Sequence, residues 1–400
     1  MSKRSNTPRE SRLLILSDVD VINNDKTSSM AIRQIFLAKL LSKNFNVTLA
    51  STFGKPREKK VGNFTIISGV RNLNFIKNNF NVVVIGLASN KDSVNYKFAK
   101  QNFNVFTIVD MYYAIIFEKL TTIENTKSGR NIFKHKLKVV SSIIKRGNHF
   151  ICATPQQRIY LLGALSSLGQ INPSNFKQSS ISVIPTLIDT DFKKYKTLKL
   201  RGNIFDRDDK IILWLGGIYP WFDPSPLINA MPTVIKNIQN AKLLILGAKH
   251  PSTQYETYYC EAVSQAKTAG LYDKSIIFLD WVNEIQSLAY TSQVDLNVIL
   301  SKKSLEDEFA FRTRILTPVS MGIPTITNGQ DYISQLIAKN DAGLITSGNA
   351  KTLAIQITDI LKNKQLILRM KKNTKKVKKD LLEISDIDNL TKLIIDNDPI

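Results

Sequence analysis

Short apolar runs rich in β-branched residues recur along the whole chain, and polar or helix-patterned stretches separate them. These runs cover residues 13–16, 47–50, 64–67, 82–85, 105–109, 149–153, 182–185, 211–215, 243–246, 275–279, 296–299 and the segment that begins at 325. Runs without polar alternation are typical of strands that are covered on both faces. The rhythm of strand and helix therefore predicts an α/β fold of doubly wound parallel sheets with helices outside.

A chain of 400 residues is longer than one compact core usually holds, which favours two domains. We predict a Rossmann-like domain over 1–192, a polar linker over 193–209 and a second Rossmann-like domain over 210–380. The remaining segment, 381–400, is expected to form a C-terminal helix that packs back toward the first domain. Ligands of such sheets bind beyond the carboxyl ends of the strands, which indicates a cleft between two facing halves.

The charge balance is strongly basic, with 55 Lys and Arg against 33 Asp and Glu and a net charge of +22. This favours anionic partners such as nucleic acid, an anionic membrane face or a phosphorylated substrate. The sequence contains no zinc-ligand spacing and no nucleic-acid recognition module, so nucleic acid is disfavoured.

The segment 131–146 has apolar residues at helical spacing and lysines largely off that stripe. Such a helix could rest on anionic lipid headgroups, although a solvated surface helix is the simpler interpretation. No apolar run reaches the length of a membrane span, and the polar segment Met1–Arg12 does not resemble a secretory signal. We therefore expect a cytoplasmic protein, with at most peripheral contact at the inner membrane face.

The segment Phe311–Arg314, with the sequence Phe-Arg-Thr-Arg, is predicted to open a short helix that ends at Gly322, before Pro324. A helix start offers free amides and partial positive charge, and Arg314 would add a full charge, so the segment could hold a phosphate. The alternative is that the two arginines pair with the acidic residues at 306–308. The spacing does not choose between these interpretations.

Three further patterns point to chemistry less specifically. Gly216-Gly217 follows a strand directly, and paired glycines let a ligand approach the backbone closely. Asp110 also follows a strand, where it could serve a ligand or cap a helix. The D-x-D pairs at 18–20 and 189–191 occur readily by chance and are assigned no metal. Cys152 and Cys260 are expected to be buried free thiols.

Read in order, these segments resemble a bacterial glycosyltransferase of family 4, which has the GT-B architecture of two facing Rossmann-like halves. The resemblance rests on W-x-G-G at 214–217, W-x-D-P at 221–224 and F-R-T-R at 311–314, which together indicate one subgroup. It extends over nearly the whole chain. One departure is Thr317, which stands where many relatives have an acidic residue that contacts the donor ribose.

The resemblance implies a retaining enzyme that transfers a sugar from a nucleoside-diphosphate sugar to a cell-envelope or polysaccharide acceptor, including a lipid-linked one. It implies no bound metal and no cofactor besides the donor. The catalytic residues would be Asp110, Glu306 and Arg314. The donor side would contain Gly216, Gly217, Lys249, Trp281, Val282, Glu308, Arg312, Thr317 and Asp331, and the acceptor side Arg33 and Glu118. A catalytically silent glycan- or partner-binding module and a nucleotide-sugar epimerase are the alternatives.

Overall fold

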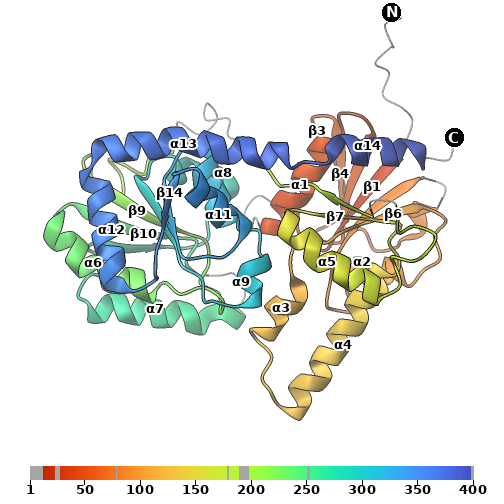
Figure 1. Cartoon of the computed structure of the whole chain (residues 1–400), viewed down its shortest axis with the longest axis horizontal. Helices are drawn as coiled ribbons and strands as arrows, with labels where there is room; N and C mark the ends of the chain where they lie inside the picture. Colours follow the sequence, from red (N-terminus) through yellow and green to blue (C-terminus); the bar gives the residue numbers. More distant parts are fainter. Residues whose placement is uncertain are drawn as a thin grey trace, which may run out of the picture. The chain divides into compact units, whose positions relative to one another are not determined.

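The computed structural model describes residues 12–22, 28–77, 79–177, 180–188, 198–249 and 253–397. The chain forms two compact units (Figure 1). The first contains the described residues up to Thr186 and those from Ile384 onward, and the second contains those between Leu187 and Glu383. Each unit is an α/β domain with its own sheet.

The first unit is built on an eight-stranded sheet in the order β3-β4-β2-β1-β5-β6-β7-β8. Neighbouring strands are parallel except for the pair β3 and β4. The strands are β1 Arg12–Ser17, β2 Asn46–Ser51, β3 Arg57–Val61, β4 Phe64–Ser68, β5 Val82–Gly86, β6 Phe106–Asp110, β7 His149–Cys152 and β8 Ile181–Val183. The helices are α1 Ser29–Leu41, η2 Asn74–Ile76, α2 Val94–Ala99, α3 Ile115–Leu120, α4 Lys127–Ile144, α5 Pro155–Ser167 and α14 Ile387–Asp396.

Alternate residues of the central strands feed two apolar clusters, one on each face of this sheet. Leu14 and Leu16 of β1 pack with α2, α4 and α5, whereas Leu13 and Ile15 pack with α1 and α14. Asp386 joins the returning chain to β8, because its carboxylate accepts a hydrogen bond from the amide of Val183 at 2.8 Å. The helix α14 thus completes one face of the first unit (Figure 1).

The second unit is built on a six-stranded parallel sheet in the order β11-β10-β9-β12-β13-β14. Its strands are β9 Lys210–Leu215, β10 Ala241–Leu246, β11 Ile276–Leu279, β12 Leu296–Ile299, β13 Thr325–Thr327 and β14 Gly343–Ile345. The helices are α6 Ser225–Asn237, η4 Thr253–Tyr255, α7 Glu256–Thr268, α8 Glu284–Thr291, α9 Leu305–Phe309, α10 Thr313–Ser320, α11 Tyr332–Lys339, α12 Ala350–Lys362 and α13 Lys364–Glu383. The strand order reverses beside β9, so the carboxyl ends of β9 and β12 flank a topological switch point, where such sheets bind ligands.

Residues 193–209 were expected to form a linker. Their described part, from 198 to 209, belongs to the second unit. Residues from 198 onward pack on the second unit, where the amide of Leu200 donates to Gln293 at 2.9 Å and Arg201 pairs with Asp295 at 2.6 Å. The N-terminal part of the first unit extends to Thr186 rather than to 192. The pair Asp189 and Asp191 lies outside the described residues.

The two cysteines differ in their surroundings. Cys152 is buried, and burial raises the pKa of its thiol to about 12. Cys260 is exposed on α7, so the prediction that it is buried was wrong. The apolar neighbours of Cys260 in the sequence lie on other faces of an amphipathic surface helix.

Candidate functional site

Arg312 and Arg314 lie at the start of α10, as the sequence predicts. Arg312 occupies the N-cap position in an extended conformation, and no side chain in the described chain caps the first amides of the helix. The neighbouring α9 is capped, because Ser304 accepts from the amide of Asp307 at 3.3 Å. The start of α10 therefore keeps its free amides and its partial positive charge for an incoming group.

The opposite end of α10 closes in the way the sequence predicts. Gly322 has a φ of +78°, its amide donates to the carbonyl of Val319 at 3.0 Å, and the amide of Ile323 donates to Pro318 at 2.9 Å. These two bonds form a Schellman motif. The helix is thus fixed at both ends, between the loop after α9 and strand β13.

Arg312 makes the ion pair that was one of the two interpretations of this segment. Its guanidinium donates to both carboxylate oxygens of Glu306, at 2.9 and 2.7 Å, and lies 3.4 Å from Asp307. All three side chains are buried. Although burial opposes the charge, Glu306 raises the pKa of Arg312 above its usual value. Glu306 was predicted to be catalytic. Both of its carboxylate oxygens accept hydrogen bonds from Arg312.

Arg314 has no such partner, because no carboxylate in the described chain forms an ion pair with it. Its Nη1 donates to the carbonyl of Gly217 at 3.0 Å, and its guanidinium carbon lies 3.8 Å from the centre of the Phe222 ring. Burial lowers the pKa of Arg314 to about 9, and the nearby Arg312 cation adds to this effect. An anion beside Arg314 would offset the cost of this poorly compensated charge.

The glycines after β9 leave the space that the Arg314 side chain occupies. Gly216 has a φ of +91°, and a Cβ there would lie 3.1 Å from Nη2 of Arg314. A Cβ on Gly217 would lie 3.3 Å from the ring of Tyr219 and 3.5 Å from that of Trp281. The two glycines, both predicted from the sequence, are thus enclosed by one cation and two aromatic rings.

The other residues predicted for the donor side lie in different surroundings. Trp281 and Val282 are half-buried in the segment after β11. Lys249 is half exposed and pairs with Glu256 at 3.2 Å, which raises its pKa. Thr317 is buried on α10, whereas Glu308 is exposed on α9.

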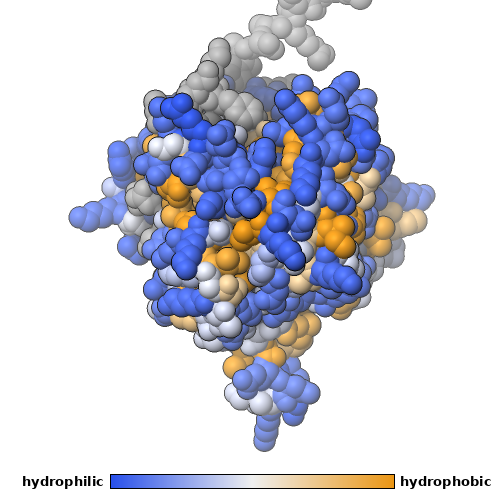
Figure 2. Space-filling model, turned by 90° about the vertical axis from the view of Figure 1, so that its left-hand side faces the viewer, coloured by the Kyte–Doolittle hydropathy of each residue, from blue (hydrophilic) through white to orange (hydrophobic). Residues whose placement is uncertain are grey.

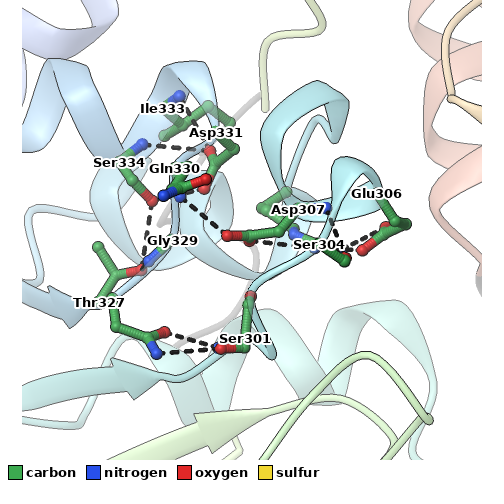
Figure 3. A network of polar contacts seen from close by, with 12 residues as sticks. Ser301, Ser304, Glu306, Asp307, Thr327, Gly329, Gln330, Asp331, Ile333 and Ser334 are labelled. Atoms are coloured by element: carbon green, nitrogen blue, oxygen red, sulfur yellow. Dashed lines mark hydrogen bonds and ion pairs between the residues drawn. The ribbon is translucent and has the colours of Figure 1, made fainter. Parts of the chain in front are cut away.

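A polar network ties α9 to the loop after β13 (Figure 3). Asp307 accepts from the amide of Gln330 at 3.0 Å, and Asp331 caps α11 through the amides of Ile333 and Ser334. Burial raises the pKa of Asp331 to about 6. The carboxylate of Asp331, predicted for the donor side, is therefore engaged in holding α11.

In the first unit, Arg33 and Asp110 form a buried pair at the carboxyl end of β6. Nε and Nη2 of Arg33 donate to the two oxygens of Asp110, at 3.0 and 3.1 Å. The same guanidinium donates to Thr186 at 3.2 Å and lies over the ring of Tyr112. Asp110, which was predicted to be catalytic, thus positions Arg33 across the edge of the sheet.

Glu118 lies half-buried on α3, the helix that follows β6. Burial raises the pKa of Tyr113, and the charge of Glu118 raises it further. Glu118 is thus within electrostatic reach of the residues that follow β6. The sequence placed Arg33, Asp110 and Glu118 together on the acceptor side, and the first unit brings them to one region of its sheet edge.

The described residues contain no group of three or more His, Cys, Asp or Glu side chains arranged to hold a metal ion. Asp18, from the first D-x-D pair, accepts from the amide of Val94 at 2.7 Å and from Asn95 at 2.9 Å. It therefore secures the start of α2.

Sequence reasoning missed the aromatic residues that surround Arg314. Tyr219 and Phe222 lie in the loop after β9, and the Tyr219 ring stacks on Trp221 with a centroid separation of 5.1 Å. The only signal was the density of aromatic residues between the two glycines and Asp223. The stacking of Phe222 against an arginine ninety-two positions later could not be deduced from that density.

The two Rossmann-like parallel-sheet domains define the GT-B fold. Residues 209–363, the greater part of the second unit, match the family model described as "Glycosyl transferases group 1". No curated protein sequence matches the chain.

Solved structures with this fold cover almost the whole chain. Sucrose-phosphate synthase from Thermosynechococcus elongatus is 14% identical with a TM-score of 0.67, over 96% of this chain and 97% of that one. WaaG, a glycosyltransferase involved in lipopolysaccharide biosynthesis, is 12% identical with a TM-score of 0.64, over 96% and 99%. Anabaena HepE in complex with UDP and glucose is 12% identical with a TM-score of 0.62, over 97% and 99%. At such identities the likeness concerns the fold.

Proposed function

We propose that this protein is a glycosyltransferase that takes a sugar from a nucleoside-diphosphate sugar. The observation that carries the proposal is Arg314, a cation without a carboxylate partner in the described chain, beside the uncapped start of α10. A diphosphate would receive charge-assisted hydrogen bonds from the guanidinium and hydrogen bonds from the free amides. Both groups would also stabilise the negative charge that develops on the diphosphate as it leaves.

The finer features follow from the resemblance described above. We propose a family 4 enzyme that retains the anomeric configuration, requires no bound metal and acts on a cell-envelope or polysaccharide acceptor. The donor would bind to the second unit, and Arg33, Asp110 and Glu118 of the first unit would be on the acceptor side. UDP is the first nucleotide to test, because a similar structure was solved in complex with UDP-glucose.

Calorimetric titration with UDP and GDP tests the anion site directly. The unchanged protein should bind at least one of them, and Arg314→Gln should weaken that binding about 10- to 100-fold, the loss expected for a charge-assisted hydrogen bond. Arg207→Gln is the matched control, because Arg207 is an exposed arginine of the same unit. Equal binding by the unchanged protein and Arg314→Gln would contradict the proposal.

Activity assays separate the proposed reaction from its alternatives. Sugar transfer from a panel of UDP- and GDP-sugars, with the product anomer determined by NMR, tests transfer and retention. Binding without turnover would instead indicate the silent module, which Thr317 favours. Conversion of a nucleotide sugar without any acceptor would indicate an epimerase.

We also propose that α3 and the first half of α4 contact an anionic membrane. Apart from Gly129, the residues of α4 up to Lys138 are exposed or half-buried, whereas the last part of the helix packs in the core. Leu120, Ile132 and Leu137 expose 49%, 49% and 37% of their surface. The projection at the bottom of Figure 2 shows apolar and hydrophilic side chains together.

The charge of this projection suits anionic lipid. The helix α4 contains several lysines and Arg130 but no acidic residue, and Lys136 has a lowered pKa because of burial and the nearby Lys119 cation. Apolar side chains would enter the interface while the cations meet the headgroups. No helix of the described chain has the length and apolar character needed to cross a bilayer.

Vesicle co-sedimentation tests this contact. We expect binding to phosphatidylglycerol vesicles but not to phosphatidylcholine vesicles, and several-fold weaker binding for Ile132→Gln/Leu137→Gln and for Lys134→Gln/Lys138→Gln. The control Lys59→Gln/Lys60→Gln removes two exposed lysines from β3 instead. Equal binding to both lipids, or equal loss in the control, would remove the proposal.

A further inference from the structure

A cavity of about 390 Å³ opens at the edge of the first unit, among the segments that follow β2, β4 and β5. Its walls include Phe53 after β2, Val70 and Arg71 after β4, Asp92 just before α2, and Val94 and Lys97 of that helix. None of these residues belongs to the Arg33–Asp110 pair. The cavity lies at the carboxyl end of the parallel strands, where doubly wound sheets bind ligands.

The walls of this cavity are held by backbone hydrogen bonds. The amide of Gly69 donates to the carbonyl of Phe53 at 2.8 Å, and the amide of Val70 donates to Ser51 at 3.0 Å. Gly69 has a φ of +68°, and a Cβ there would lie 2.6 Å from the backbone nitrogen of Pro56. The loop after β2 is therefore fixed against the loop after β4, and the cavity is preformed.

Charged side chains line the cavity without being neutralised by ion pairs. Within the described ranges, Arg71, Lys97 and Asp92 form no ion pair, and together they give the lining a net positive charge. The first amides of α2 are already occupied, because the amide of Val94 donates to Asp18 and those of Asn95 and Tyr96 donate to the Ser93 hydroxyl. The attraction for an anion therefore comes from the two cations rather than from the helix.

The lining of the cavity also contains apolar side chains beside the two cations. Phe53 exposes half of its surface, and Val70 and Val94 provide aliphatic wall. A cavity of this size can enclose a small ligand, and an apolar wall with a few charged groups fixes its orientation. Arg71 can bind a phosphate or a carboxylate through two parallel hydrogen bonds.

We propose that this cavity is an acceptor subsite for a sugar that carries an anionic group, either a phosphate or a carboxylate. Arg71 and Lys97 bind the anion, and the Phe53 ring packs against the apolar face of the sugar. Its role as an acceptor subsite rests on the glycosyltransferase function proposed above. The binding itself does not depend on that function.

Calorimetric titration without any donor tests the binding. Glucose 6-phosphate and glucuronate should each bind at least about tenfold more tightly than glucose, and their ratio distinguishes a phosphate site from a carboxylate site. Arg71→Gln and Lys97→Gln should each weaken the binding of the anionic sugars about three- to tenfold. Lys100→Gln is the matched control, because Lys100 caps the end of the same helix and does not line the cavity.

A gain of affinity provides the sharpest test, because a misfolded variant cannot imitate it. Asp92→Asn removes the one acidic side chain of the lining and should tighten the binding of both anionic sugars about two- to threefold. The proposal is overturned if no sugar binds, if glucose binds as well as the anionic sugars, or if none of the three variants changes the affinity.

A parallel titration with UDP separates this inference from the proposed function. A protein that binds UDP but none of the sugars refutes the subsite and leaves the glycosyltransferase proposal intact. A protein that binds the anionic sugars through Arg71 and Lys97 but binds no nucleotide supports the cavity and refutes the donor site at Arg314.

Discussion

The guanidinium carbon of Arg314 lies 3.8 Å from the centre of the Phe222 ring. The guanidinium of Arg312 contacts the same ring, at 4.7 Å. One aromatic side chain from the loop after β9 thus orients two cations from the start of α10. The two arginines nevertheless differ, because only Arg312 is neutralised by carboxylates.

Phe222→Leu should raise the UDP dissociation constant about three- to tenfold, because it removes a cation–π contact worth about 0.5–1 kcal/mol or more when desolvated. Calorimetry at a temperature where the protein is fully folded measures the change. Phe45→Leu, a comparable loss from the buried core of the first unit, is the control for lost stability. If both variants bind UDP equally well, Phe222 does not position Arg314.

Gly216→Ala should weaken UDP binding at least about tenfold, because the new Cβ would lie 3.1 Å from Nη2 of Arg314 and displace the guanidinium. The positive φ adds a backbone penalty of about 1–2 kcal/mol. Gly270→Ala carries the same kind of penalty at a φ of +69°, with nothing within 4 Å of its Cβ. A loss of stability in both variants with a loss of binding only in Gly216→Ala is the expected pattern.

Glu306→Ala should destabilise the second unit by about 3–5 kcal/mol, because it leaves the buried Arg312 without its main partner. Urea unfolding measures this loss, and Glu308→Ala, at an exposed position of the same helix, should be nearly neutral. If Glu306→Ala abolished sugar transfer with no loss of stability, Glu306 would act on the substrate and not through Arg312.

His149 should make the first unit sensitive to acid. Burial lowers its pKa to about 4, so the unfolded chain binds a proton below about pH 6.5 while the native protein does not. Stability is therefore lost as the pH falls from about 6.5 toward 4. Between pH 7 and pH 4.5 the unchanged protein should lose about 2–3 kcal/mol more than His149→Gln does.

Urea unfolding at the two pH values measures that difference. His135→Gln serves as the control, because His135 is exposed on α4. An equal loss of stability in the unchanged protein and in His149→Gln would contradict this prediction. It would show that His149 titrates alike in the native and the unfolded protein.

The fold could be predicted from the sequence because continuous apolar runs define buried parallel strands, and every such run overlaps a strand. The strand β3 was missed because its sequence is charged and its residues are mostly exposed. It is an antiparallel strand at the edge of the sheet, where charged residues are common. The strand β14 was missed because three residues carry too little pattern.

For the site, the sequence located the arginines but left their partners open. Arg312 lies just before α10 in an extended conformation and Arg314 lies inside its first turn, so the two side chains leave the chain in different directions. One therefore meets Glu306 and the other meets Gly217 and Phe222. Only the tertiary packing of two distant loops could decide this. The ion-pair interpretation holds for Arg312, and the anion-site interpretation stays a prediction for Arg314.

The return of the chain to the first unit at Ile384 has a consequence for biosynthesis. A ribosome delivers the strands of that unit long before it delivers Leu390 and Ile394, which cover one face of their sheet. This face of the nascent first unit therefore stays uncovered until the second unit and α14 have been translated. Loss of α14 by truncation or proteolysis would uncover the same apolar surface in the mature protein.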